Sequence, residues 1–258
     1  MSNNEKWDLP QLYHSKITKQ LSPLIKLFEK HEDWPSIDNY KTIFKQFNLN
    51  IKPVPQSEFI SQFEEQYESR IYLKNELQTR IHNWHDFFNV MIWLKFPTTK
   101  KALNSLHYKS SILRPKGSNR STLENRITQF DECGAVIISN DKYLLDLIKN
   151  HQWGEIFIHN REQFSKNLEC VIFGHAIFEK ALKPYIGMTC HCILLHNEEI
   201  LNDVQSGNVV KLDQYLANYW LQSIANHPKK FHAFPVLGIP DYWSPQNIEF
   251  YENKSYFR

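Results

Sequence analysis

The sequence predicts an α+β fold that is predominantly helical with a small β-sheet. In the first half, apolar residues recur every three or four positions behind residues that commonly cap helices. After Lys116-Gly117, short runs rich in Val, Ile and Leu alternate with amphipathic segments, which indicates strands between helices. We therefore expect one globular domain over residues 1–258, with a helical part at 1–116 and an α+β part at 117–258.

The helices expected in the first half begin at capping residues. Ser22 precedes a proline, the arrangement typical of a helix start. Ser36 precedes a helical stripe made of Ile37, Tyr40, Ile43, Phe44 and Phe47. Two prolines in NLNIKPVPQ, residues 48–56, force extended backbone. The next segment, YESRIYL at 67–73, fits a helix or a strand equally well.

A further helix is expected from Asn83 to Phe96, where Pro97 ends it. The helix after it runs through TKKALNSLHYKSSI, and Thr98 or Thr99 is the expected cap. Asn104 and His107 share one face of that helix, and we expect surface or packing roles for both.

The second half is expected to contain three strands that form the small sheet: AVIIS at 135–139, EIFIH at 155–159 and TCHCILL at 189–195. Asp131 and Glu132 are expected in an acidic turn before the first strand. The helices are expected at 142–151 behind the cap Asp141, at 160–182 as one helix or a pair, and at 212–225. The aromatic tail from Phe231 onward is expected to pack on the body.

The charge balance argues against a protein that binds duplex nucleic acid. Thirty basic and 28 acidic residues give a formal net charge of +2, without the basic stripe that such binding requires. No secretory signal and no membrane-spanning run is visible, so we expect a cytoplasmic protein with reduced thiols. Cys190 and Cys192 share one strand face and do not form a CxxC motif. The sequence leaves the oligomeric state open.

The segment HNWHDFFNVMIWLKF, residues 82–96, combines polar and apolar residues in an unusual way. On a helix its polar side consists of His82, His85, Asp86 and Asn89, together with Trp93. The remaining circumference is apolar, which is typical of a helix inside a protein. A buried polar group without a partner costs on the order of 1–3 kcal/mol, so we expect these side chains to be paired.

A second apolar segment, VIFGHAIFEKAL at 171–182, carries His175 and Glu179 four residues apart. Gly174 next to this histidine predicts the close approach of another backbone or of a ligand. If the two helices meet, two imidazoles and two carboxylates come together. That set suits a divalent metal ion such as zinc, manganese or iron, although the spacing is not that of HExxH.

Three interpretations of these residues stay open. They form a structural hydrogen-bonded network, an enzyme site for acid–base chemistry, or a non-catalytic site for a small molecule or partner. Asp131 and Glu132 either belong to the residue set in any of these three interpretations or only form a solvated turn. Lys100 and Arg126 are candidate ligands for an anionic group.

The leading hypothesis is a hydrolase-like pocket with a divalent metal ion. No phosphate-binding loop, dinucleotide fingerprint, GxSxG elbow or kinase motif set is present. In this hypothesis His85 and His175 are metal ligands or the base, with Glu179 as a further ligand. Asp86 and Glu179 orient the rings, and Asn89 is a hydrogen-bond donor behind them. Substituting His85 or Glu179 separates this hypothesis from the structural network.

Five ordered motifs give the sequence a family resemblance. They are NWHDFFN, FPxxKxxLN, FDExG, FGHAxxEK and PVLGIPxYW, at 83–89, 96–104, 130–134, 173–180 and 235–243. The chain resembles a family of bacterial proteins known only as a domain of unknown function, over roughly residues 50–258. A small departure is Ile127-Thr128-Gln129, where the family has a leucine after the threonine. The resemblance implies one domain and no activity.

Overall fold

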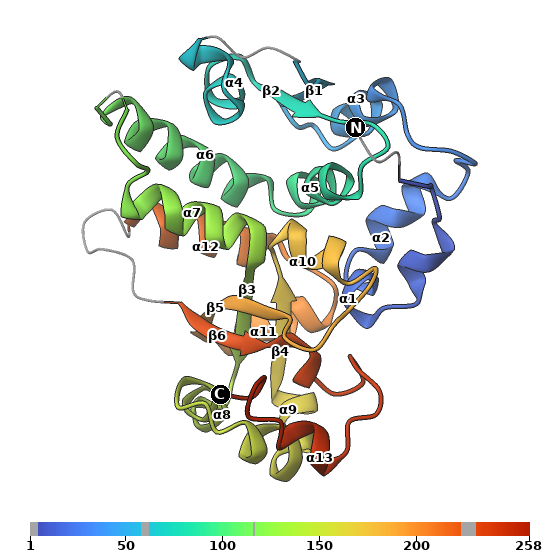
Figure 1. Ribbon diagram of the computed structural model, residues 1–258, viewed down its shortest axis with the longest axis vertical. Helices are drawn as coiled ribbons and strands as arrows, with labels where there is room; N and C mark the ends of the chain where they lie inside the picture. The colour runs from blue at the N-terminus through green and yellow to red at the C-terminus, as the bar shows by residue number, and fades with distance from the viewer. Residues whose placement is uncertain (1–4, 58–61, 116, 223–230) are drawn as a thin grey trace. The chain divides into compact units, whose positions relative to one another are not determined.

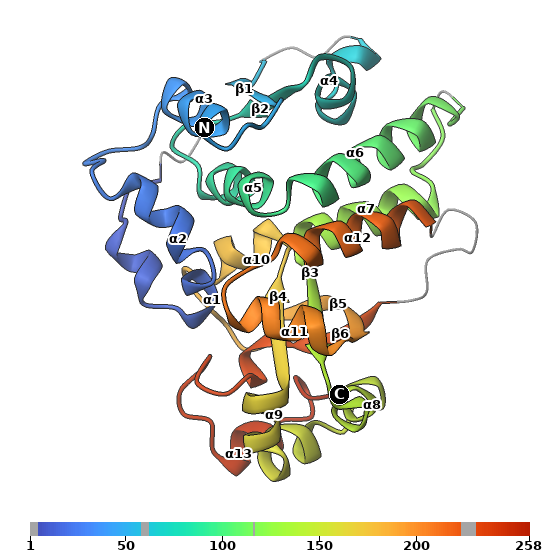
Figure 2. The same ribbon diagram turned by 180° about the vertical axis from the view of Figure 1, so that it is seen from behind.

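The computed structural model describes residues 5–57, 62–115, 117–222 and 231–258 (Figures 1 and 2). The fold is α+β and predominantly helical, as predicted. The chain forms two compact units, each built from discontinuous segments. Unit 1 comprises Met1–Leu12, Leu21–Thr128 and Asp213–Pro228, and unit 2 comprises Tyr13–Gln20, Gln129–Leu212 and Lys229–Arg258.

Unit 1 is mostly helical with one short pair of parallel strands. Its described elements are α2 (Ser22–Ile25), η2 (Lys26–Phe28), α3 (Ile37–Gln46), β1 (Lys52–Pro55), η3 (Phe63–Glu65), α4 (Tyr67–Lys74), β2 (Glu76–Thr79), α5 (Trp84–Lys95), α6 (Pro97–Ile112) and most of α7 (Thr122–Cys133) and α12 (Val210–Gln222). The 3-10 turn η1 (Pro10–Tyr13) lies at the first junction. In Figure 2 the pair β1–β2 lies between α3 and α4, and both helices pack on it.

Local signals explain the first helices of unit 1. Ser36 caps α3 through a reciprocal capping box with Asn39, as predicted. Residues 52–55 are extended, as the prolines predicted. The segment YESRIYL is a helix, which ends at Asn75 in the left-handed conformation with φ of 54°. The helix start at Ser22 was wrong by one residue, because Leu21 occupies the cap position and no side chain bonds there.

The helix α5 occupies the predicted place. Asn83 caps it by accepting a hydrogen bond from the backbone N–H of Asp86 at 3.0 Å. Trp84 at its first position stacks on Trp7, with ring centroids 5.2 Å apart, and also contacts Trp34 at 4.6 Å. These aromatic contacts bury the start of the helix and hold the N-terminal segment to unit 1.

The prediction that Thr98 or Thr99 caps α6 was wrong, because a residue distant in the sequence does so. The Asp213 carboxylate accepts hydrogen bonds from the backbone N–H groups of Thr98 and Thr99, at 2.9 and 2.7 Å. The Thr99 hydroxyl also donates to it at 2.6 Å. A carboxylate at a helix start satisfies the unpaired N–H groups and interacts favourably with the helix dipole. Asp213 therefore joins α12 to α6.

Unit 2 is built around a four-stranded sheet. Its elements are α1 (Lys16–Lys19), the end of α7, β3 (Gly134–Ser139), α8 (Lys142–Lys149), the π-helical turn η4 (Glu155–His159), α9 (Arg161–Asn167), β4 (Leu168–Ile172), α10 (His175–Lys180), β5 (Thr189–His196), α11 (Glu198–Gln205), β6 (His232–Pro235), η6 (Val236–Gly238) and α13 (Ile248–Tyr251). The strand order is β4-β3-β5-β6, with only β3 and β5 parallel. In Figure 1 the helices α8 and α9 lie at one end of this sheet.

Two of the predicted strands, β3 and β5, form the centre of the sheet. The prediction of a strand at 155–159 was wrong, because EIFIH forms a π-helical turn. The prediction of helix throughout 160–182 was also wrong, because residues 168–172 form β4. The run LECVI is apolar at almost every position, and such a run has no periodicity that separates a buried strand from a buried helix. Its backbone hydrogen bonds go to β3 instead.

The expected acidic turn is the last turn of a helix. The helix α7 continues through Asp131 and Glu132 to Cys133, and β3 begins at the next residue. Gly134 makes this direct junction possible, because a Cβ atom there would lie 2.5 Å from the Phe130 ring. The correction matters for function because it places both carboxylates at a helix C-terminus.

The aromatic tail packs within unit 2. Tyr251, Tyr256 and Phe257 are buried, and the Tyr256 hydroxyl donates to the Met188 carbonyl at 2.6 Å. The amphipathic helix expected at 212–225 is α12, but its predicted last residues lie outside the described part of the chain. In that described part, no helix is both long and apolar enough to cross a membrane.

We expect Asp213→Ala to lower the free energy of unfolding by about 2–3 kcal/mol, because it removes a cap and leaves the buried Thr99 N–H without its acceptor. Urea denaturation followed by circular dichroism measures this change. Asp146→Ala, at an exposed position on α8, is the matched control and should have a much smaller effect. Equal effects of the two substitutions would contradict the capping role of Asp213.

Candidate functional site

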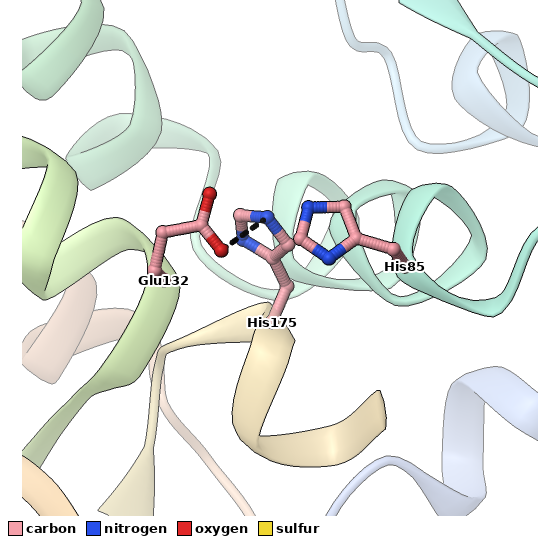
Figure 3. Close-up of side chains that lie close together, drawn as sticks. All are labelled: His85, Glu132 and His175. Carbon is pink, nitrogen blue, oxygen red and sulfur yellow. Dashed lines mark ion pairs between the residues drawn. The ribbon is translucent and has the colours of Figure 1, made fainter. Parts of the chain in front are cut away.

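Unit 2 brings one histidine between two carboxylates. His175 is the first residue of α10, and its side chain is 4% exposed. Its Nε2 atom lies 3.6 Å from Oε2 of Glu132, and its Nδ1 atom lies 3.8 Å from Oδ2 of Asp131. Figure 3 shows the Glu132 carboxylate directed at the His175 ring. The two carboxylates therefore face the two nitrogens of one imidazole.

Gly174 makes this approach possible. A Cβ atom at this position would lie 2.5 Å from the Cα atom of Cys133 and closer still to the carbonyl oxygen of Glu132. The Gly174 N–H also donates to the carbonyl of Gly134 at 2.8 Å, which fixes the start of α10 against the junction of α7 and β3. The predicted close approach of another backbone beside Gly174 is confirmed.

The distance between Glu132 and His175 fits a shared metal ion better than a hydrogen bond. A hydrogen bond between these atoms is typically 2.7–3.2 Å long, so 3.6 Å is too far. Two ligands of a tetrahedral zinc ion, each about 2.0–2.1 Å from the metal, lie about 3.3–3.4 Å apart. A shift of a few tenths of an ångström would bring Oε2 and Nε2 to that separation.

Asp131 lies on the opposite side of the ring and suits a different role. A metal-binding histidine usually donates its second N–H to a carboxylate, which fixes the tautomer and the ring orientation. Oδ2 of Asp131 lies 3.8 Å from Nδ1, on the side where such a carboxylate is needed. Asp131, His175 and Glu132 could thus serve as an orienting carboxylate, a ligand ring and a second ligand.

The two carboxylates lie at a helix end that carries partial negative charge of its own. The C-terminus of a helix carries partial negative charge, and acidic side chains in the last turn add to it. The last turn of α7 contains Asp131 and Glu132 and no basic residue. In unit 2, the Lys180 ammonium contacts Cys133, whose Sγ lies 3.5 Å from Nζ. A bound cation would offset this concentration of negative charge.

The comparison with known families assigns the chain to one of them. The family described as a protein of unknown function, DUF3025, matches residues 51–258. The chain belongs to this family. The family resemblance predicted from the five motifs is confirmed. Comparison with curated proteins and with solved structures gives no match.

The residues Asp131, Glu132, Gly174 and His175 all lie within the DUF3025 match. The description of DUF3025 names no activity. The chemistry of the site therefore has to be argued from its own geometry.

Asp86, predicted to orient a catalytic ring, is held by Arg80 in this DUF3025 member. Oδ1 accepts a hydrogen bond from Nη2 at 2.8 Å, and Oδ2 accepts from Nε and from the backbone N–H of Arg80, at 3.1 and 2.7 Å. Both carboxylate oxygens are thus occupied at the start of α5. This arrangement favours a structural role for Asp86.

Asn89, on the predicted polar side of α5, is buried and paired within unit 1. The Lys100 ammonium donates to Oδ1 of Asn89 at 2.9 Å, and the Asn89 amide donates to the Tyr67 hydroxyl at 2.6 Å. The Lys100 ammonium also lies over the Trp93 ring, 5.3 Å from its centre. Lys100 is 4% exposed, so this cation is held inside the unit.

The other predicted site residues occupy different environments. His85 is half-buried on α5, and Glu179 is half-buried near the end of α10. Nη1 of Arg126 is buried without a hydrogen-bond partner among the described residues, and the guanidinium lies near Tyr219. Asn104 and His107 are buried, in agreement with a packing role, and the Asn104 amide donates to the Glu68 carboxylate at 2.6 Å.

The four cysteines are free, and three of them are buried in the sheet region. Burial raises the pKa of the Cys170, Cys190 and Cys192 thiols far above the usual range for cysteine. Burial also raises the pKa of the Cys133 thiol, although the nearby Lys180 acts in the opposite direction. None of the four is therefore an activated nucleophile.

We expect Gly174→Ala to lower the free energy of unfolding by roughly 1–3 kcal/mol, because the new methyl group overlaps the backbone of Glu132 and Cys133. The matched control is Gly154→Ala, where a Cβ atom meets nothing within 4 Å and φ is −61°. The control should be neutral or slightly stabilising. Urea denaturation of both variants tests this difference, and equal stabilities would show that the close approach is not a constraint.

We also expect the thiols of Cys170, Cys190 and Cys192 to resist alkylation at pH 8, because raised pKa values keep them protonated and burial excludes the reagent. Iodoacetamide labelling followed by mass spectrometry, with and without urea, measures the reaction. Rapid labelling of any of the three in the folded protein would contradict the conclusion that these thiols are buried and protonated.

Proposed function

We propose that the chain is a metal-dependent hydrolase in which His175 and Glu132 bind a divalent cation. The observation that supports this most directly is the 3.6 Å separation of Nε2 and Oε2, which is too long for a hydrogen bond and near the separation of two metal ligands. The burial of His175 and the absence of a basic residue from the last turn of α7 support the same proposal.

The donor set favours zinc, manganese or iron. One imidazole nitrogen and one carboxylate oxygen are ligands that all three ions accept, and no thiolate belongs to the set. In the proposal, Asp131 accepts the second N–H of the His175 ring and keeps Nε2 available to the metal. The helical pattern of residues 82–96 adds His85 as a further ligand, and Glu179 stays a predicted co-ligand.

A divalent ion held by few protein ligands keeps positions for water and substrate. Such an ion lowers the pKa of bound water toward 7 and polarises a carbonyl or phosphoryl oxygen, which is the chemistry of hydrolysis. The side chain of Glu132 is 37% exposed, so water and a substrate can reach the Glu132 carboxylate although His175 is buried. Metal-dependent hydrolysis is therefore the reaction class that we propose.

The competing hypothesis is a non-catalytic protein in which the same residues only stabilise the core. At 3.6 Å the contact between Nε2 of His175 and Oε2 of Glu132 is too long for a hydrogen bond of such a network and close to the separation of two metal ligands. We therefore favour the metal site over the network.

We expect about one divalent metal ion per chain in untagged protein that is purified without a chelator. His175→Ala and Glu132→Gln should each lower the metal content at least tenfold, because each removes one of two ligands and the metal affinity falls accordingly. Inductively coupled plasma mass spectrometry measures the content. The matched controls are His196→Ala and Glu198→Gln, on the same unit and away from the pair, which should retain the metal.

A metal-free wild-type protein that also fails to take up zinc or manganese on dialysis would refute the metal site. His85→Ala tests the ligand that the sequence alone predicts. Its retention of metal would remove His85 from the ligand set and leave the pair in unit 2. Stoichiometric metal without metal-dependent turnover of chromogenic carboxylic and phosphoric esters would refute the hydrolase and leave a structural metal.

A further inference from the structure

Unit 1 contains a surface pocket that is distinct from the His175 cluster. Its volume is about 600 Å³, within the usual range of small-molecule sites. It is lined by the end of α3, the segment that leads into β1 and the end of α4, through the residues Lys41, Lys45, Asn48, Leu49, Asn50, Ile51, Lys52, Lys74 and Asn75. All of them belong to unit 1.

The lining of this pocket is basic. It includes four lysines and three asparagines and no carboxylate. Two of the lysines are compensated from outside the lining: Lys41 pairs with Asp38 at 2.7 Å, and Lys74 pairs with Glu65. Lys45 and Lys52 are exposed and have no ion pair with any described residue. The pocket therefore keeps an excess of positive charge.

The asparagines add neutral donors to these charges. The side-chain amides of Asn48, Asn50 and Asn75 form no hydrogen bond with another described residue. Asn48 and Asn75 both adopt the left-handed conformation with φ of 54°, each just after a helix end, so the chain turns sharply on both sides of the pocket. Amide N–H groups beside ammonium groups suit the oxygens of an anion.

Helix stabilisation does not account for the whole set. Lys45 and Lys74 lie in the last turns of α3 and α4, where a cation offsets the helix dipole. Lys52 begins β1 and Lys41 lies in the middle of α3, so neither has that function. The two helix ends and the strand instead direct their lysines toward one pocket.

We propose that this pocket binds a compact polyanion that carries two or more phosphate groups. The uncompensated ammonium groups of Lys45 and Lys52, beside the paired Lys41 and Lys74, match more than one negative charge, and lysine is a common phosphate-binding residue. Leu49 and Ile51 are the apolar residues of the lining, which contains no aromatic ring on which a base would stack. The phosphate groups are thus the part of the ligand that the pocket recognises.

The test is isothermal titration of the full-length protein with inorganic pyrophosphate in a metal-free buffer at physiological ionic strength. Lys45→Gln/Lys52→Gln removes the two uncompensated charges and should weaken binding at least tenfold. Lys30→Gln/Lys101→Gln removes the same charge from exposed positions of unit 1 outside the pocket and should bind like the wild type.

No binding of pyrophosphate by the wild type would overturn the proposal. Equal weakening in both double variants would also overturn it, because the effect would then follow net charge alone. His175→Ala should bind pyrophosphate like the wild type in the metal-free buffer. Loss of binding in that variant would assign the phosphate to the candidate metal site instead.

Discussion

The candidate site depends on the close packing of Gly174 against the backbone of Glu132 and Cys133. Only a residue without a side chain allows the start of α10 to lie this close to the end of α7. The hydrogen bonds from Phe173 and Gly174 to the carbonyl of Gly134 hold the two segments together. Because of this packing, His175 at the first position of α10 faces two carboxylates.

The chemistry that we propose follows from the burial of His175 and from the position of the two carboxylates that this packing produces. It buries an imidazole and places two negative charges at a helix C-terminus, where the backbone is itself partly negative. Neither carboxylate lies within hydrogen-bond distance of the ring. A divalent cation bound by both His175 and Glu132 would offset the negative charge, and it would need about the observed separation of Nε2 and Oε2.

The pocket of unit 1 is lined by positively charged side chains and is formed by the ends of α3 and α4.

Much of the fold was predictable because its signals are local. Asn83, Ser36 and Asp141 cap helices as expected, and the central strands β3 and β5 were recognised from their composition. The predictions of secondary structure and caps failed where contacts between residues distant in the sequence determine the structure. The strand β4 is apolar at every position except Glu169, and its pairing with β3 distinguishes it from a helix. The cap of α6 comes from Asp213, more than one hundred residues away.

The site was predictable only in part for the same reason. His175 and the close approach at Gly174 followed from an odd histidine and glycine in an apolar run. Glu132 was expected in a turn, and its part in the site was left open, because no local signal reveals that α7 continues to Cys133 and that α10 returns to its end.

X-ray absorption spectroscopy of the zinc-loaded protein tests most directly the claim that His175 and Glu132 bind a metal ion. We predict nitrogen and oxygen ligands at about 2.0–2.1 Å with imidazole scattering. Sulfur scattering at about 2.3 Å would contradict it, because the metal would then be bound by cysteines.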